Sequence, residues 1–179
     1  KDALAAAAAI AAAVERIGAE RPDTVATVGV LQPRPGAVNV IAGRVDFALD
    51  ARAPVDAARA AMMAEITAAL REIAARRGVG LSCEETMDSP ATPMHPALQA
   101  ALRAGVESLQ LRPLELSSGA GHDAVAMATL CPAAMLFVRC KGGISHNPAE
   151  SITAADADAA MRVLLATVLA LEPSALSRR

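Results

Sequence analysis

Two short runs of the sequence combine small residues with a histidine and could line a ligand site. The first is Ser-Ser-Gly-Ala-Gly-His-Asp-Ala over residues 117–124, and the second is Ser-His-Asn-Pro-Ala-Glu over residues 145–150. Glycine lets the backbone approach a ligand closely, and histidine can act as a base or bind a metal ion. An apolar segment separates the runs, so we expect two loops at one end of a sheet that converge on a pocket.

His146 is the strongest single candidate for chemistry. It follows the glycine pair at 142–143, and Pro148 stiffens the chain on its far side. Its imidazole could therefore be held as a metal ligand or as a base. The alternative is a histidine that only closes a surface loop. Neither His95 nor His122 stands at helical ligand spacing from it, so any further ligands must come from elsewhere.

His122 and Asp123 admit two interpretations. They could be a base and the carboxylate that orients it, or they could begin a helix. At a helix start, the backbone N–H groups of Gly121 and His122 would bind an anionic or carbonyl group, whereas Asp123 could simply cap the helix. The residues alone leave these alternatives open.

Asn39 and Arg52 stand on two successive predicted strands. A guanidinium offers a planar fork for a carboxylate, and an amide beside it offers a donor and an acceptor. The pair could therefore bind a carboxylate. Solvent-facing Arg and Asn are also common on strands, and Asp46 and Asp50 could simply pair with Arg52 at the surface.

The elements that must position these residues follow from hydrophobic periodicity and turn signals. The pattern predicts helices over residues 2–17, 54–77, 96–109, 122–130 and 153–171, with stop signals at Gly18, Gly78 and Pro173. It predicts strands over residues 24–32, 38–41, 44–52, 79–86, 114–116 and 133–138. In the strand over 44–52, alternation places Val45, Phe47 and Leu49 on one face. It places Asp46, Asp50 and Arg52 on the other.

A Ser-Pro-Ala-Thr-Pro linker at 89–93 divides the chain. Residues 1–89 are one strand short of a βαββαβ ferredoxin-like sandwich, which is an α+β arrangement. Residues 90–179 alternate helix with apolar strand, which is typical of an α/β layer over a buried sheet. The chain begins at Lys1 with no initiator Met and no preceding strand, so we expect it to be the middle of something larger, with the N-terminal part absent.

Composition and charge argue against several classes of protein. A formal net charge of −2 over 179 residues gives no electrostatic case for binding nucleic acid. No apolar run approaches the roughly 18 residues that span a membrane. Cys83, Cys131 and Cys140 lack metal-type spacing and are odd in number, which favours a reducing, cytoplasmic setting.

Several segments, taken together, resemble the carbamoylase and allantoate amidohydrolase branch of the M20 metallopeptidase-like family. They are Pro-Gly-Ala-Val-Asn-Val-Ile-Ala-Gly at 35–43, Phe-Ala-Leu-Asp-Ala-Arg at 47–52, and the two glycine–histidine runs. The similarity spans essentially residues 1–172 in order. Members have an α/β catalytic domain with a two-metal site and an inserted βαββαβ lid that forms the dimer. The resemblance therefore implies a lid/dimerisation domain at 1–89, with its first strand missing, and the C-terminal part of the catalytic domain at 90–179.

The resemblance also implies a function and a role for individual residues. Members hydrolyse N-carbamoyl groups from amino acids or related ureido acids. They use two divalent metal ions, zinc or manganese, with cobalt or nickel as alternatives. His146 matches a metal-ligand histidine, and Gly121 matches a loop glycine whose backbone contacts the substrate. Asn39 and Arg52 match lid residues that bind the substrate carboxylate from the partner subunit. The implied partners are a small ureido-acid substrate and a second copy of the chain, in a homodimer formed through the lid.

No catalytic residue of the family matches a position in this chain, because the catalytic glutamate, the lid histidine and the other metal ligands lie in the family's N-terminal part. We therefore expect the chain alone to be inactive and to bind metal weakly. Two alternatives stay open: an aminoacylase or dipeptidase of the same superfamily, and a non-catalytic ferredoxin-like dimerisation or ligand-binding module. Ala42, where many members have Pro, and Arg139-Cys140, where Pro-Ser is common, depart from the pattern without removing a functional group.

Overall fold

The computed structural model describes residues 1–172 and residue 176. It divides into two compact units: unit 1 is Lys1–Ala91 with Ser117–Gly119, and unit 2 is Thr92–Leu116 with Ala120–Arg179. The helix stop expected at Pro173 lies outside the described residues.

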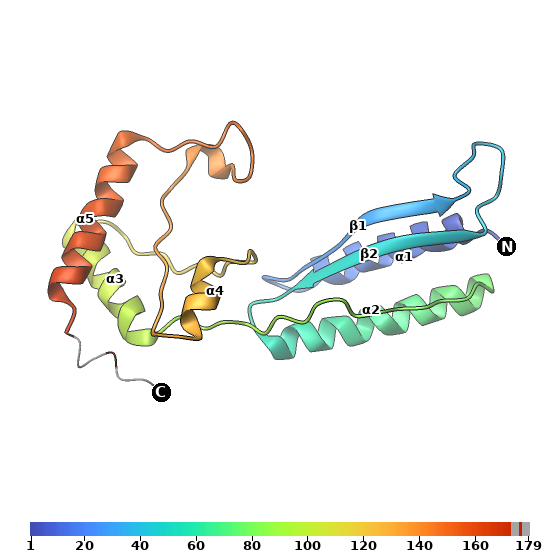
Figure 1. The fold of residues 1–179 in the computed structure, drawn as a ribbon, viewed down its shortest axis with the longest axis horizontal. Helices are drawn as coiled ribbons and strands as arrows, with labels where there is room; N and C mark the ends of the chain where they lie inside the picture. The colour runs from blue at the N-terminus through green and yellow to red at the C-terminus, as the bar shows by residue number, and fades with distance from the viewer. Residues whose placement is uncertain (173–175, 177–179) are drawn as a thin grey trace. The chain divides into compact units, whose positions relative to one another are not determined.

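Unit 1 is a two-stranded antiparallel sheet with two helices on one face (Figure 1). Its elements, in chain order, are α1 (Ala3–Ala19), β1 (Val25–Arg34), β2 (Arg44–Arg52) and α2 (Asp56–Arg77). The strand register pairs Val25 with Arg52 at one end of the hairpin and Arg34 with Arg44 at the other. The loop over residues 35–43 therefore closes the hairpin at the Arg34–Arg44 end.

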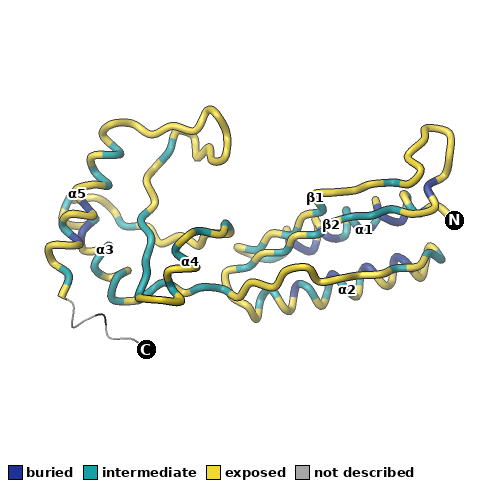
Figure 2. Tube along the Cα trace, in the orientation of Figure 1, coloured by how far each residue is buried: buried dark blue, intermediate teal, exposed yellow. Residues whose placement is uncertain are grey.

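The core of unit 1 lies between the sheet and the two helices. The buried side chains come from one face of each helix: Ile10, Val14, Ile17, Met62, Ile66, Leu70 and Ile73. Figure 2 shows these buried helix faces in dark blue. Phe47 and Leu49 pack against this core, as the alternation along residues 44–52 predicts. The side chains of Asp46, Asp50 and Arg52 consequently lie on the opposite face of the sheet.

Two glycines of unit 1 have different roles. Gly18 was expected to stop the first helix, but α1 continues to Ala19. A Cβ on Gly18 would lie 2.7 Å from the backbone nitrogen of Ala26, so this glycine instead lets α1 approach β1 closely. Gly78 does end α2, as predicted, in the left-handed conformation that favours glycine, with φ of 64°.

Unit 2 contains α3 (Pro96–Ser108), α4 (Asp123–Ala128), the 3₁₀ turn η1 (Lys141–Gly143) and α5 (Ala154–Ala170). Helices α3 and α5 pack closely at Gly105, where a Cβ would lie 2.7 Å from the hydroxyl oxygen of Thr167. The predicted cap of the last helix is confirmed. The backbone N–H of Asp156 donates to the Thr153 hydroxyl at 3.1 Å.

Four predicted strands do not form ladders, and these predictions are wrong for the described residues. The segments are 38–41, 79–86, 114–116 and 133–138; within residues 1–172 the sheet consists of β1 and β2. An extended apolar segment becomes a strand only when a neighbouring strand pairs with its N–H and C=O groups. No described residue supplies such a partner to these segments. Helix α4 is also shorter than the predicted 122–130.

Candidate substrate-binding and metal-ligand residues

Arg52 ends β2, and two partners hold its guanidinium. Nε and Nη2 donate to the two carboxylate oxygens of Asp50, at 2.6 and 3.1 Å. Nη1 donates to the carbonyl oxygen of Gly119 at 2.7 Å. The hydrogen bond to Asp50 raises the pKa of Arg52 above its ordinary value. The guanidinium is therefore a fixed positive charge, and its predicted surface pairing with Asp50 is confirmed.

Asp46 lies on the same face of β2 but pairs with other arginines. Its carboxylate accepts from Arg34 Nε at 2.8 Å and from Arg44 Nη2 at 2.7 Å. These hydrogen bonds lower the pKa of Asp46 below its usual range. Asp46 therefore belongs to the loop end of the hairpin, and the expected pairing with Arg52 is made by Asp50 alone.

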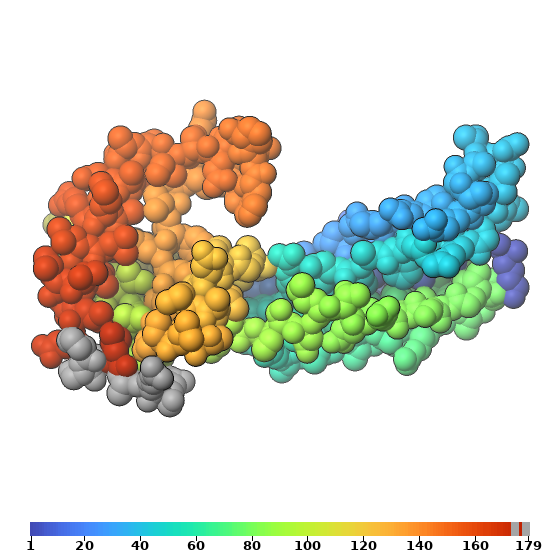
Figure 3. Space-filling view, viewed as in Figure 1, coloured from blue at the N-terminus to red at the C-terminus, as the bar shows by residue number. Residues whose placement is uncertain are grey.

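Asn39 does not lie on a strand. It occupies an exposed position in a turn of the loop 35–43, which Figure 3 shows in light blue at the surface of unit 1. Arg52 lies at the other end of the hairpin, because the loop follows the Arg34–Arg44 pair. At about 3.3 Å per residue, the length of β2 separates the two ends by roughly 26 Å. The amide and the guanidinium of one chain therefore cannot bind the same carboxylate, and the expectation that they lie side by side is wrong.

The first glycine–histidine run leads into α4. His122 is the N-cap residue, and its ring contacts Phe137 edge to face, with 5.7 Å between ring centroids. Asp123 is the first residue of α4 rather than its cap, which favours the interpretation of this run as a helix start. A Cβ on Gly121 would meet no atom of the described residues within 4 Å. Packing among the described residues therefore does not explain why this position is a glycine.

The second glycine–histidine run is a loop closed by its own hydrogen bonds. The backbone N–H of His146 donates to Glu150 Oε2 at 2.9 Å. The backbone N–H of Ala149 donates to Asn147 Oδ1, also at 2.9 Å. The hydroxyl of Ser145 lies 2.8 Å from Nδ1 of the His146 ring. The run therefore holds both the backbone and the ring of His146.

The backbone of His146 adopts the left-handed region, with φ of 57°. This conformation is uncommon for a residue other than glycine and costs conformational energy. The hydrogen bond to Glu150 offsets that cost. Neither Glu150 nor the carbonyl of Gly119 carries a sequence signal that predicts its bond. The sequence shows only that Glu150 follows His146 by four residues, with Pro148 between them.

His146 fits one ligand position of a metal centre. Its side chain is exposed, and because Nδ1 faces the Ser145 hydroxyl, Nε2 is the nitrogen available to a metal ion. Within residues 1–172 and 176, no group of three or more His, Cys, Asp or Glu side chains could hold a metal ion. The described part of the chain thus offers an imidazole ligand, not a complete centre.

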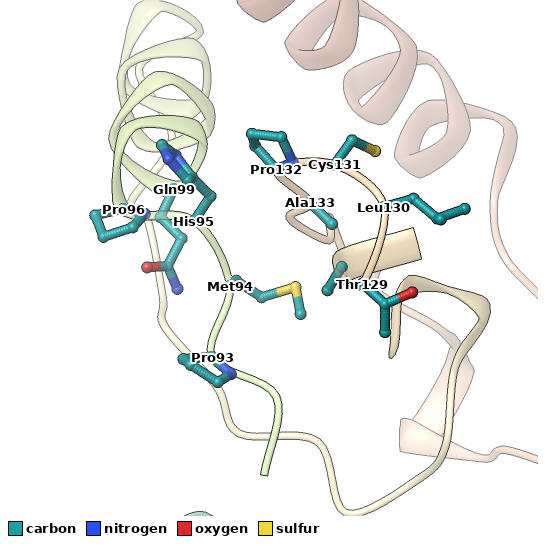
Figure 4. A pocket seen from close by; sticks show the side chains of 11 residues that line it. Pro93, Met94, His95, Pro96, Gln99, Thr129, Leu130, Cys131, Pro132 and Ala133 are labelled. Carbon is teal, nitrogen blue, oxygen red and sulfur yellow. The ribbon is translucent and has the colours of Figure 1, made fainter. Parts of the chain in front are cut away.

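Unit 2 also has a cavity of about 530 Å³ (Figure 4). It is lined by residues 93–96, Gln99 and residues 128–133, so it involves neither glycine–histidine run. The Nδ1 atom of His95 is buried and has no hydrogen-bond partner among the described residues. The expected pocket between the two runs is not this cavity. The sheet end that was to bring the runs together does not form, because residues 133–138 have no partner strand within residues 1–172.

Comparison with known proteins assigns the chain to a family. Residues 1–170 match the Peptidase family M20/M25/M40, and the chain belongs to this family. It is 39% identical over 169 residues to an N-carbamoyl-L-amino acid amidohydrolase of Geobacillus stearothermophilus, covering 94% of this chain and 41% of that protein. It is also 39% identical over 149 residues to an allantoate deiminase of Arabidopsis thaliana, covering 79% of this chain and 28% of that protein. The chain thus spans less than half the length of either relative.

A solved structure shows the same architecture. An amidase of the hydantoinase/carbamoylase family from Burkholderia multivorans superposes with a TM-score of 0.87 and 39% sequence identity, covering 94% of this chain and 41% of that one. The mixed helices and small sheet of this chain therefore match part of the α/β carbamoylase fold. The predicted fold class and the predicted branch of the family are both confirmed.

Proposed function

We propose that the chain is part of an amidohydrolase that removes the carbamoyl (ureido) group of N-carbamoyl-L-amino acids or allantoate-like ureido acids. In this proposal residues 1–89 form the lid and dimerisation domain, and residues 90–179 form the C-terminal part of the catalytic domain. The observation that carries it is the guanidinium of Arg52, held at two sides on the exposed face of β2. Arg52 belongs to a chain that is 39% identical to an N-carbamoyl-L-amino acid amidohydrolase.

The proposal gives each candidate residue one role. Arg52 and Asn39 bind the substrate carboxylate, and Gly121 contacts the substrate through its backbone. His146 binds one of two divalent metal ions, which are zinc or manganese, with cobalt or nickel as alternatives. When bound, two such metal ions would polarise the ureido carbonyl of the substrate and activate the attacking water. The open space around the Cβ position of Gly121 supports its role, because it leaves room for a ligand against the backbone.

Asn39 and Arg52 enter this site from different subunits of a homodimer. The two ends of the hairpin lie roughly 26 Å apart, so a single carboxylate can contact both residues only when two chains contribute. The family resemblance implied that Asn39 and Arg52 both reach the substrate from the same partner subunit, and the proposal differs from it on this point. Each substrate is instead bound between Arg52 of one subunit and the amide from the loop 35–43 of the other.

The proposed location is the cytoplasm. Cys83, Cys131 and Cys140 are free, which suits a reducing compartment. Within residues 1–172 and 176, no helix is long and apolar enough to cross a membrane.

The function is tested in a chimaera in which residues 1–172 replace the corresponding segment of the Geobacillus stearothermophilus amidohydrolase, to which 94% of this chain aligns. With added manganese or zinc, we expect the chimaera to hydrolyse N-carbamoyl-L-amino acids and the 179-residue chain alone to give no turnover. Faster hydrolysis of N-acetyl amino acids or dipeptides would favour the aminoacylase or dipeptidase alternative. A folded, dimeric chimaera without any amidohydrolase activity would favour a non-catalytic module.

Glu150 should affect metal binding through His146. In the chimaera, Glu150→Ala removes the acceptor that holds the left-handed backbone of His146. We expect the affinity for zinc, titrated against a competing chelator, to fall about 10- to 100-fold, as for other residues that orient a ligand. Glu107→Ala, an exposed glutamate on α3, is the matched control. An unchanged affinity in Glu150→Ala would mean that the loop holds His146 without this carboxylate.

A further inference from the structure

We propose that Asp50 is a positioning residue for Arg52: its carboxylate fixes the guanidinium so that the outer edge of the fork faces the substrate carboxylate. The inference rests on the proposed function, in which Arg52 binds that carboxylate. It adds a residue of this chain that does not itself touch the substrate but determines how tightly the substrate is bound.

The hydrogen bonds of Arg52 leave a defined part of its fork for a ligand. A guanidinium has five N–H donors. Asp50 accepts one from Nε and one from Nη2, and Gly119 accepts one from Nη1. These three bonds occupy Nε–H and one N–H on each of the two terminal nitrogens. One N–H on each terminal nitrogen remains, and this pair matches the two oxygens of a carboxylate.

The contact with Asp50 contributes little to the stability of the fold. The side chains of Arg52 and Asp50 are 52% and 56% exposed, and ion pairs exposed to this extent contribute little to folding. The two-point contact instead fixes the plane of the guanidinium, which a single contact would leave free to rotate. A long side chain that is ordered before binding does not lose that freedom when the ligand arrives. Asp50 therefore acts on affinity rather than on stability.

Asp46 provides a matched control on the same strand. It lies on the same face of β2 and is likewise paired with arginines, but with Arg34 and Arg44 at the loop end of the hairpin. Asp46→Asn thus removes the same charge and the same kind of surface ion pair as Asp50→Asn. Only Asp50→Asn releases the guanidinium of Arg52.

Asp50 also carries a negative charge close to the proposed carboxylate, and removing that charge would by itself strengthen substrate binding. A high salt concentration distinguishes the loss of this charge repulsion from the loss of guanidinium orientation. At about 0.5 M salt the Debye length falls to about 4 Å, so repulsion between exposed charges is largely screened. The orientation of the guanidinium by a two-point hydrogen bond persists under these conditions. The kinetic comparison is therefore made at this salt concentration.

The first measurement uses the 179-residue chain itself. In nitrogen-15 NMR spectra, the Nε–H of Arg52 should give a slowly exchanging signal, assigned by its loss in Arg52→Lys. The signal should exchange rapidly in Asp50→Asn and stay unchanged in Asp46→Asn. A signal in Asp50→Asn that exchanges as slowly as in the unsubstituted chain would overturn the proposal.

The second measurement is the steady-state kinetics of the chimaera with an N-carbamoyl-L-amino acid. We expect Asp50→Asn to raise KM about three- to tenfold, with kcat within about twofold, because only ground-state orientation is lost. Asp46→Asn should leave both constants unchanged, and the corresponding amide, which lacks a carboxylate, should show no rise in KM. An unchanged KM in Asp50→Asn, or an equal rise for the amide, would overturn the role of Asp50. An unchanged KM in Arg52→Ala would instead overturn the proposed function itself.

Discussion

Replacing His146 with alanine in the chimaera is expected to abolish nearly all turnover and to remove bound metal. In the proposed function the imidazole binds one of the metal ions, and the backbone and ring of His146 are both held by the surrounding loop. Removing a ligand should cost more than removing a residue that only orients one, so we expect a loss of more than about 100-fold in kcat/KM. Metal content by elemental analysis and turnover in the same preparation measure both effects.

The His146→Ala variant should stay folded, because the side chain is exposed and contributes little to packing. His95→Ala is a suitable control, since His95 lies against the cavity of unit 2 and outside both glycine–histidine runs. The control should retain its metal and its activity. Normal metal content and turnover in His146→Ala would refute the ligand assignment.

Replacing Arg52 is expected to weaken substrate binding far more than the loss of a surface charge would. Arg52→Ala removes a charged, two-point contact, and we expect KM for N-carbamoyl-L-amino acids to rise about 10- to 100-fold. Arg52→Lys should restore little of this, because an ammonium cannot donate in parallel to a carboxylate while also bonding Asp50 and Gly119.

Arg44→Lys is the control for this prediction, since Arg44 lies on the same face of β2 and is paired with Asp46. Its KM should match that of the unsubstituted chimaera. If Arg52→Lys bound the substrate as well as Arg52 does, bidentate recognition of the carboxylate would be wrong.

Local patterns in the sequence were enough to predict the elements that carry these residues. The alternation along residues 44–52 predicts both β2 and its faces, since a strand repeats every second residue. The cap at Thr153 and the stop at Gly78 are likewise encoded by neighbouring residues. Residues 133–138 are different: their apolar pattern suits a strand, but pairing needs a second segment that no local pattern specifies.

In the candidate site, too, local patterns predict some features, and contacts between distant residues determine the others. The loop around His146 is recognisable because the residues that build it lie within six positions of one another. The bond from Arg52 to Gly119 joins residues 67 positions apart, and only the folded chain reveals it. The predicted strand over 38–41 was also wrong, because these residues lie in the loop that joins β1 to β2.

The central claim is that each site takes Arg52 and Asn39 from different subunits, and mixing inactive variants of the chimaera tests it most directly. His146→Ala is mixed and reassociated separately with Arg52→Ala and with Asn39→Ala, and heterodimer formation is verified in both mixtures. A heterodimer has one intact site only when the second substituted residue acts in the partner's site. We therefore predict that one mixture recovers about a quarter of the activity of the unsubstituted chimaera and that the other recovers none. Recovery in both mixtures, or in neither, would contradict the account.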